Sequence, residues 1–201
     1  TDGDSWLTTV DTALTTTLSY LRNARDLVVR AGDGGLGQAS RNALADNIDG
    51  LREGILAQAN TRYMGRTVFA GTSDAGTAYT VDAADPAHPT YTWTGSPGAA
   101  VERRIGPNTL VRVDTDGSQA FGADDGVDTS VFALLSDISA DLRAGVAVTG
   151  KLTDIDSRMQ KLLAAASANG SRQKVVQSMQ SDLSDQSLTV GSQLSGVEDI
   201  D

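Results

Sequence analysis

Cysteine is absent from this sequence of 201 residues, and histidine occurs only once, at His88. The absence of cysteine excludes disulfides, thiolate metal sites and cysteine nucleophiles. Aromatic residues make up only 4% of the chain, which favours thin helical layers and a small sheet over a deep enzyme core. No apolar run approaches the roughly 20 residues that a membrane-spanning helix needs.

Positive charge is also scarce, because the chain contains 16 basic and 26 acidic residues and has a net charge of −10. A nucleic-acid-binding protein would present a basic face, and a protein that binds anionic lipid would present a basic cluster. We therefore expect neither nucleic acid nor membrane among the partners of this chain.

The strongest pattern in the sequence lies between Lys151 and Ile200, where apolar residues recur in two rows of a seven-residue repeat with polar interruptions at Asn169, Gln173, Gln180 and Ser187. No proline interrupts this stretch, so the pattern predicts one helix of about 48 residues and roughly 70 Å. The stripe could be wholly internal core of a single rod, or part of it could be an interface between identical rods packed side by side, and the pattern leaves both interpretations open. The rows are Leu152, Met159, Ala166, Gln173, Gln180, Ser187 and Leu194, and Ile155, Leu162, Asn169, Val176, Leu183, Val190 and Val197.

Helical periodicity predicts three further helices, over Thr1–Ala31, Gln38–Arg62 and Asp128–Arg143. The glycine-rich segment Gly32–Gly37 ends the first helix. Because this connection is so short, the first two helices are expected to lie antiparallel as a helical hairpin.

Between the second and third helices the period changes to that of β-structure, and all four prolines fall in this part of the chain. The sequence therefore predicts an α+β fold, in which an elongated helical rod (residues 1–71 and 127–201) carries an inserted small antiparallel β subdomain (residues 72–126). The predicted strands are Thr67–Ala70, Thr77–Asp82, Tyr91–Thr94, Val101–Ile105 and Leu110–Asp114.

No catalytic, cofactor-binding or metal-binding residues are predicted. His88 lies in a loop without an accompanying serine or carboxylate motif, and it is interpreted as solvent-exposed. The acidic segments around Asp116 and Asp125 do not fit the spacing of a calcium loop and are interpreted as an Asp-Gly turn and an exposed loop. Gly32–Gly37 lacks the strand and lysine of a phosphate-binding loop, and Arg103-Arg104 is interpreted as part of a salt-bridged sheet face.

A family resemblance rests on several short motifs that occur in order along the chain. They resemble the flagellin family and, within it, the hook-associated protein 3 branch, whose Gly-Arg-x-x-Phe-Ala-Gly form occurs here at residues 65–71. The motifs are Asn60–Gly71, Tyr91–Gly95, Arg104–Gly106, Val111–Val113, Asp116–Gly122, Asn169–Arg172 and Leu194–Asp201.

The resemblance implies a non-enzymatic structural subunit of the bacterial flagellum at the junction between hook and filament. It implies self-association in a ring, contacts with hook-associated protein 1 and flagellin, an export chaperone, and extracellular assembly after export by the flagellar type III system. The terminal helices of that family have no counterpart here, so we expect a core fragment trimmed at both ends. The expected contact surfaces are the exposed faces of the first and last helices and Gly32–Gly37.

Two alternatives remain open at this point. The chain could be filament flagellin itself. It could instead be a surface adhesin or carbohydrate-binding module that uses Tyr79, Tyr91 and Trp93 of the β insert as a platform for sugars.

Overall fold

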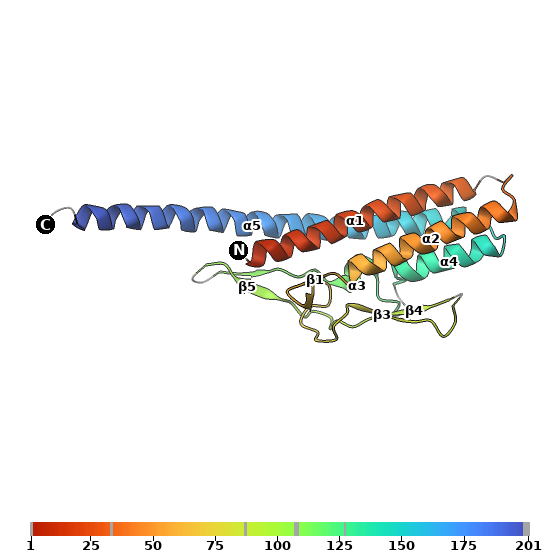
Figure 1. Cartoon of the computed structure of the whole chain (residues 1–201), viewed down its shortest axis with the longest axis horizontal. Coiled ribbons are helices and arrows are strands. Elements are labelled where there is room, and N and C mark those ends of the chain that lie inside the picture. Colours follow the sequence, from red (N-terminus) through yellow and green to blue (C-terminus); the bar gives the residue numbers. More distant parts are fainter. Residues whose placement is uncertain (1, 33, 87, 107–108, 127, 199–201) are drawn as a thin grey trace.

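The computed structural model describes residues 2–32, 34–86, 88–106, 109–126 and 128–198, and for 196–198 only the backbone. The predicted first residue Thr1, Asp33 of the connection, and the end of the C-terminal motif from Asp199 onward lie outside the described residues. The predicted α+β fold class is confirmed: long helices form an elongated body, and short antiparallel strand pairs lie along one side of it (Figure 1).

Four helices make up the body. α1 (Asp2–Ala31) and α2 (Gln38–Ala59) run antiparallel, and α4 (Val131–Arg143) packs along α2. After a short 3-10 turn at Thr149–Lys151, α5 (Leu152–Glu198) runs antiparallel to α1. It continues far beyond the N-terminal end of α1 (Figure 1). α5 contains 47 residues, so the prediction of one long C-terminal helix is confirmed.

The predicted helix boundaries are close but not identical to those of the structure. α2 ends at Ala59 rather than Arg62, because Arg62 already belongs to the first strand pair. α4 begins at Val131 rather than Asp128, because the hydroxyl of Ser130 caps it by accepting a hydrogen bond from the backbone N–H of Ala133.

Within the described residues, the β-structure consists of three separate antiparallel pairs of two strands, rather than one sheet. The predicted strand Thr67–Ala70 is wrong beyond Thr67, because residues 68–70 are buried bends. One continuous core joins the strand pairs to the helices, so the core does not mark a boundary between a rod and an inserted subdomain. The division of the chain into these two parts stays a prediction. The pairs are β1 (Arg62–Tyr63) with β2 (Arg66–Thr67), β3 (Tyr79–Asp82) with β4 (Thr90–Trp93), and β5 (Glu102–Arg104) with β6 (Leu110–Arg112).

A short helix, α3 (Gly117–Phe121), follows β6 and packs against α5. Its N-cap is Asp116, whose carboxylate accepts a hydrogen bond from the backbone N–H of Ser118 at 3.0 Å. Gly117 is tightly enclosed, since an added Cβ would lie 2.5 Å from the carbonyl oxygen of Phe69. The Asp-Gly pair therefore begins a helix, and its interpretation as a simple turn was wrong.

Asp128 ties the start of α4 to α5. Its Oδ1 atom lies 2.7 Å from Nη2 of Arg158 and 2.8 Å from Nζ of Lys161. Burial acts to raise the pKa of Asp128, but the hydrogen bonds and charges of Lys161 and Arg158 outweigh it, so the pKa lies below its usual value.

This ion pair should make stability depend on pH. A carboxyl group with a lowered folded-state pKa stabilises the fold above its unfolded pKa, and this contribution disappears as the pH falls through the folded pKa. We expect Asp128→Asn to lower the free energy of unfolding by about 1 kcal/mol at neutral pH, with the difference fading below about pH 4. Urea denaturation of both proteins across this range measures the effect, and an equal difference at every pH would contradict it.

The elongated shape can be tested in solution. A compact domain of this size would have a maximum dimension of about 45–50 Å, whereas α5 alone extends roughly 70 Å. Small-angle X-ray scattering should therefore give a maximum dimension of at least about 70 Å. A value near that of the compact domain would mean that α5 does not extend in solution.

Candidate assembly surface

The seam of α5 is the stripe of residues that the seven-residue repeat places on one face of the helix. In the first half of the helix this seam is covered by the other helices. The row facing α1 is completely buried at Ile155, Leu162, Asn169 and Val176. This half of the stripe is internal core, but the interpretation that the whole stripe is internal core is wrong, because its second half is exposed.

Polar seam residues make specific contacts with the N-terminal part of α1. The buried Nδ2 of Asn169 donates a hydrogen bond to the carbonyl oxygen of Leu7 at 2.9 Å. Nε2 of Gln173, one turn further along, lies 3.1 Å from the hydroxyl of Thr8. Because these hydrogen bonds form in only one alignment of the two helices, they favour one register of α1 against α5. The Oδ1 atom of Asn169 has no hydrogen-bond partner among the described residues.

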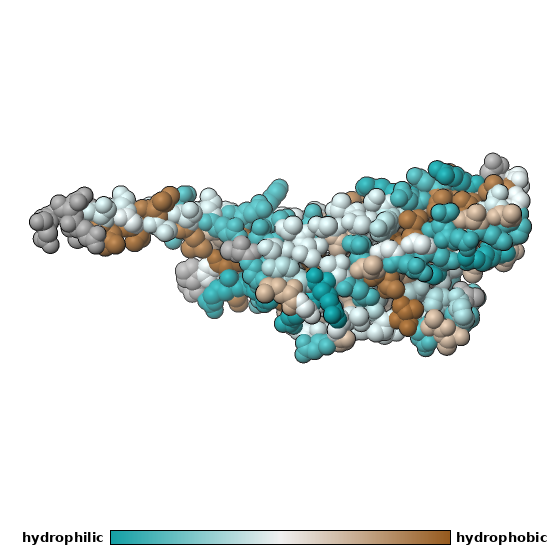
Figure 2. Space-filling view, viewed as in Figure 1, coloured by the Kyte–Doolittle hydropathy of each residue, from teal (hydrophilic) through white to brown (hydrophobic). Residues whose placement is uncertain are grey.

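Coverage of α5 ends near Met179, which approaches Gly106 in the loop between β5 and β6. From 181 to 195 every residue is exposed, and we call this segment the free segment of α5. The seam nevertheless continues through it, with Leu183, Val190 and Leu194 exposed by 39%, 63% and 58%. Figure 2 shows these apolar patches on the part of α5 that projects beyond the other elements.

A helix with an apolar seam and no covering element is typical of an interface that is completed by another chain. Leu188 is also exposed, but it lies off the seam, one residue after Ser187. For the free segment, the interpretation of the repeat as an interface between subunits stays a prediction.

The other expected contact surface, Gly32–Gly37, lies at the opposite end of the helical body, where it connects α1 to α2 (Figure 1). The backbone N–H of Gly32 donates to the carbonyl oxygens of Val28 and Val29, so the predicted end of the first helix is confirmed. His88 is exposed, as predicted, and its Nδ1 lies 3.3 Å from a carboxylate oxygen of Asp85.

The acidic residues examined as calcium ligands are occupied by protein donors. Asp114 is fully buried and accepts hydrogen bonds from the side chain of Arg112. Asp124 accepts from the backbone and hydroxyl of Ser130, and Asp125 accepts from the backbone N–H of Asp128. Among the described residues, no group of three or more potential ligands could hold a metal ion.

Arg103 forms an ion pair, as predicted, but with a partner from outside the sheet. Its Nε lies 3.0 Å from Asp2 at the start of α1, and its guanidinium group lies over the ring of Trp6 at 5.4 Å. This contact joins the β5–β6 pair to the helical body.

The predicted aromatic platform for sugars is wrong. Tyr79 and Tyr91 are buried and pack against Phe132, with ring centroids 4.9 and 5.1 Å from it. The hydroxyl of Tyr79 lies between the carbonyl oxygens of Gly117 and Gly122, and burial raises its pKa above the usual value. Trp93 donates its Nε1–H to the carbonyl oxygen of Phe69. Tyr79 and Tyr91 belong to the core beneath the strand pairs and are not available for stacking on a sugar, whereas Trp93 is partly buried against that core.

Within the described residues, none of the helices combines the length and apolarity that crossing a membrane requires. The long helical body, the projecting apolar seam and the enclosed aromatic core together define an elongated, mainly helical protein with one uncovered helix segment.

Comparison with known proteins agrees with this class. Residues 1–74, which contain α1, α2 and the β1–β2 pair, match the model of the bacterial flagellin N-terminal helical region. No curated protein sequence matches the chain significantly.

Solved structures make the assignment of the fold more specific. Flagellar hook-associated protein 3 from Legionella pneumophila superposes with a TM-score of 0.83 at 14% identity, over 99% of this chain and 94% of that one. FlgL from Xanthomonas campestris gives 0.79 at 16% identity, covering 94% and 93% of the two chains. FlgL from Bacillus cereus gives 0.76 at 19% identity, covering 94% and 87%. The chain therefore has the flagellin-type N-terminal region and the fold of hook-associated protein 3, as the resemblance implied.

Proposed function

We propose that this chain is a structural subunit of the bacterial flagellum that connects the hook to the filament. The observation that supports this most directly is the fold, which matches hook-associated protein 3 over almost the whole chain. The free segment of α5 adds a physical reason, because an apolar seam on a projecting helix needs a covering partner. In this role the protein acts mechanically and catalyses nothing.

The seam of the free segment is proposed to pack against a second copy of this chain within a ring. The repeat that pairs α5 with α1 up to Val176 keeps its seven-residue spacing through Leu183, Val190 and Leu194, with polar residues at Gln180 and Ser187. A repeat of the same spacing can pack against a helix of the next chain as its first half packs against α1. Hook-associated protein 1, flagellin and an export chaperone are the further partners that the family resemblance implies. The location is then the extracellular hook–filament junction, reached through the flagellar type III system.

Deletion of the encoding gene tests the role. A strain that lacks a junction subunit should keep its hooks, form no filaments and release flagellin into the medium. Loss of filament flagellin itself would also leave bare hooks, but with no flagellin to release. A deletion strain with normal filaments would contradict both functions.

Complementation of the deletion strain tests the seam separately. The double substitution Leu183→Gln/Leu194→Gln removes two apolar side chains from the seam and should fail to restore filaments. Leu188→Gln, which removes an even more exposed leucine away from the seam, should restore them. Equal behaviour of the two variants would show that the seam has no special part in assembly, without affecting the result of the deletion.

A further inference from the structure

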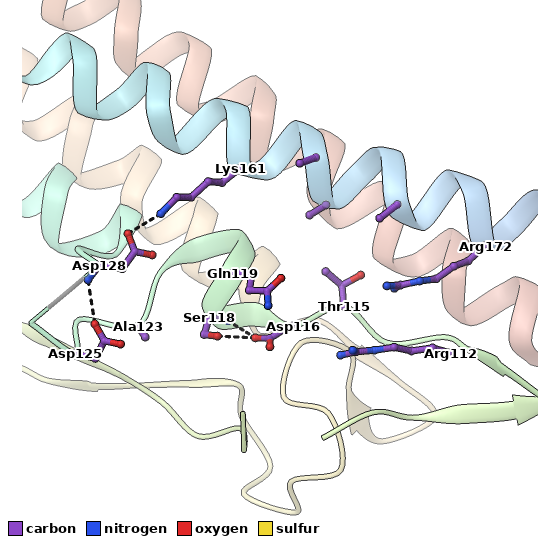
Figure 3. A pocket seen from close by; sticks show the side chains of 13 residues that line it. Arg112, Thr115, Asp116, Ser118, Gln119, Ala123, Asp125, Asp128, Lys161 and Arg172 are labelled. Atoms are coloured by element: carbon purple, nitrogen blue, oxygen red, sulfur yellow. Dashed lines mark hydrogen bonds and ion pairs between the residues drawn. The ribbon is translucent and has the colours of Figure 1, made fainter. Parts of the chain in front are cut away.

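A cavity of about 520 Å³ lies between the middle of α5 and the segment that joins β6 to α3 (Figure 3). This volume is within the range of small-ligand sites, roughly 300–1,000 Å³. One wall is a short apolar surface of α5, formed by Ala164, Ala165 and Ala168. Charged side chains lie at both ends of the cavity. The two ends differ in how fully ion pairs neutralise these charges.

At one end the charges are already paired. Lys161 and Asp128 form an ion pair at 2.8 Å. This end offers little to a charged ligand. Asp116 lies between the two ends (Figure 3), where it adds a negative charge near Arg112. Its carboxylate is occupied in capping α3, since its Oδ1 accepts from the backbone N–H and the hydroxyl of Ser118.

At the other end, the guanidinium groups of Arg112 and Arg172 extend in the same direction into the cavity (Figure 3). Arg112 uses Nε and Nη2 to bind both carboxylate oxygens of the buried Asp114, at 2.9 and 3.0 Å. This carboxylate therefore neutralises Arg112, and it is fully enclosed.

Arg172 is left without a carboxylate of its own. Its Nη1 donates to the backbone carbonyl oxygen of Asp114 at 2.7 Å, and among the described residues it forms no ion pair. Burial lowers its pKa and the positive charge of Arg112 lowers it further, while the negative charge of Asp114 offsets only part of this. A nearby anion would relieve both effects.

Thr115 supplies an independent sign of a ligand. It is only 6% exposed, and its Oγ1 has no hydrogen-bond partner among the described residues. Figure 3 shows Thr115 between the two guanidinium groups at the edge of the cavity. A buried hydroxyl without a partner costs free energy unless a group in the cavity binds it.

We propose that Arg172, Arg112 and Thr115 form a binding site for a carboxylate group. Arg172 supplies N–H donors and a positive charge that no ion pair among the described residues neutralises, Thr115 supplies an O–H donor, and Arg112 lines the same end of the cavity. The ligand is either a small carboxylic acid or an acidic side chain of another protein chain. The proposal rests on the cavity alone and is independent of the proposed flagellar role.

Nuclear magnetic resonance on the whole 201-residue chain can test the site, with the side-chain Nε–H signals of Arg112 and Arg172 as reporters. Succinate tests the free acid, and N-acetylaspartate amide tests the acidic side chain. Their neutral counterparts, succinamide and N-acetylasparagine amide, are the matched controls. At least one carboxylate should shift the Arg172 signal saturably, with a Kd of about 1 mM or tighter, and the neutral compounds should not.

Three variants localise the effect. Arg172→Gln and Thr115→Val should each weaken binding about 10-fold, the loss expected for a hydrogen bond to a charged group. Lys174→Gln removes the same charge from an exposed position two residues away and should leave binding unchanged. Thr115→Val keeps the shape of the side chain, so it tests the site even if Arg172→Gln weakens the fold.

Each outcome decides the matter. Preference for succinate assigns the site to a free acid, and preference for the aspartyl compound assigns it to a protein side chain. The proposal is overturned if no carboxylate shifts Arg172, if the neutral compounds bind equally, or if Lys174→Gln weakens binding as much as Arg172→Gln.

Discussion

Replacing Leu162 by alanine should lower the free energy of unfolding by about 3 kcal/mol, the middle of the range for fully buried leucines. Leu162 has no exposed surface and lies on the α5 row that faces α1, between Ile155 and Asn169. Its truncation leaves a cavity between long helices that cannot easily close, because neighbouring contacts hold both helices in place. Urea denaturation followed by circular dichroism measures the loss.

Leu194→Ala is the matched control, since it makes the same change on the same seam of the same helix. Leu194 is 58% exposed, so its truncation should change stability by no more than about 0.5 kcal/mol. The contrast between the two variants separates the half of the seam that holds the fold together from the half that remains uncovered. Equal losses would mean that the free segment is covered in solution, and small losses from both would mean that α5 does not pack on α1.

The helices could be predicted from the sequence because their apolar positions recur at regular spacing and because glycine ends the first of them. The length of α5 followed from the same regularity, since no proline interrupts the repeat. The repeat could not show where the other elements of the fold stop covering α5. Leu162 and Leu183 occupy equivalent positions in it, and only the positions of α1 and the β5–β6 loop make one buried and the other exposed.

The β region was harder to predict, because its burial depends on contacts between distant segments. Thr90–Trp93 has the alternation of a half-buried strand, and β4 is indeed a strand. The same alternation does not tell whether Tyr91 faces solvent or the core. An exposed sugar platform was therefore one possibility, but in the structure the ring packs on Phe132. Phe69 was taken as part of a strand because of its apolar neighbours, whereas its carbonyl oxygen accepts hydrogen bonds from Trp93 and Gly117.

The proposed carboxylate site could not be found in the sequence for a related reason. Arg112 and Arg172 are 60 positions apart, and nothing in either segment indicates that they meet. The aspartates near Arg112 do not fit the spacing of a calcium loop, so they predict only a turn and an exposed acidic loop. Only the structure shows that one of these aspartates caps a helix and that another is buried against an arginine.

Replacing Asp114 by alanine should lower the free energy of unfolding by about 3–4 kcal/mol, because removing one partner of a buried ion pair leaves the other charge uncompensated. Asp114 is fully buried, and besides Arg112 it also accepts a hydrogen bond from the backbone N–H of Val101 at 2.8 Å. The loss of its carboxylate therefore leaves a cation and a buried N–H without their partner. Urea denaturation again provides the measurement.

A double-mutant cycle with Arg112→Met separates the pair from the rest of the effect. If the charges act together, the combined variant should lose about 1–3 kcal/mol less than the sum of the single losses. Asp137→Ala provides the control. The carboxylate of Asp137 is about half exposed and forms a long ion pair with Lys151, at 3.9 Å, so its removal should cost no more than about 0.5 kcal/mol. Strictly additive losses would mean that Asp114 matters only for Val101. Since Arg172 binds the main-chain carbonyl oxygen of residue 114, which alanine retains, the cycle measures the Arg112–Asp114 pair without removing the anchor of Arg172.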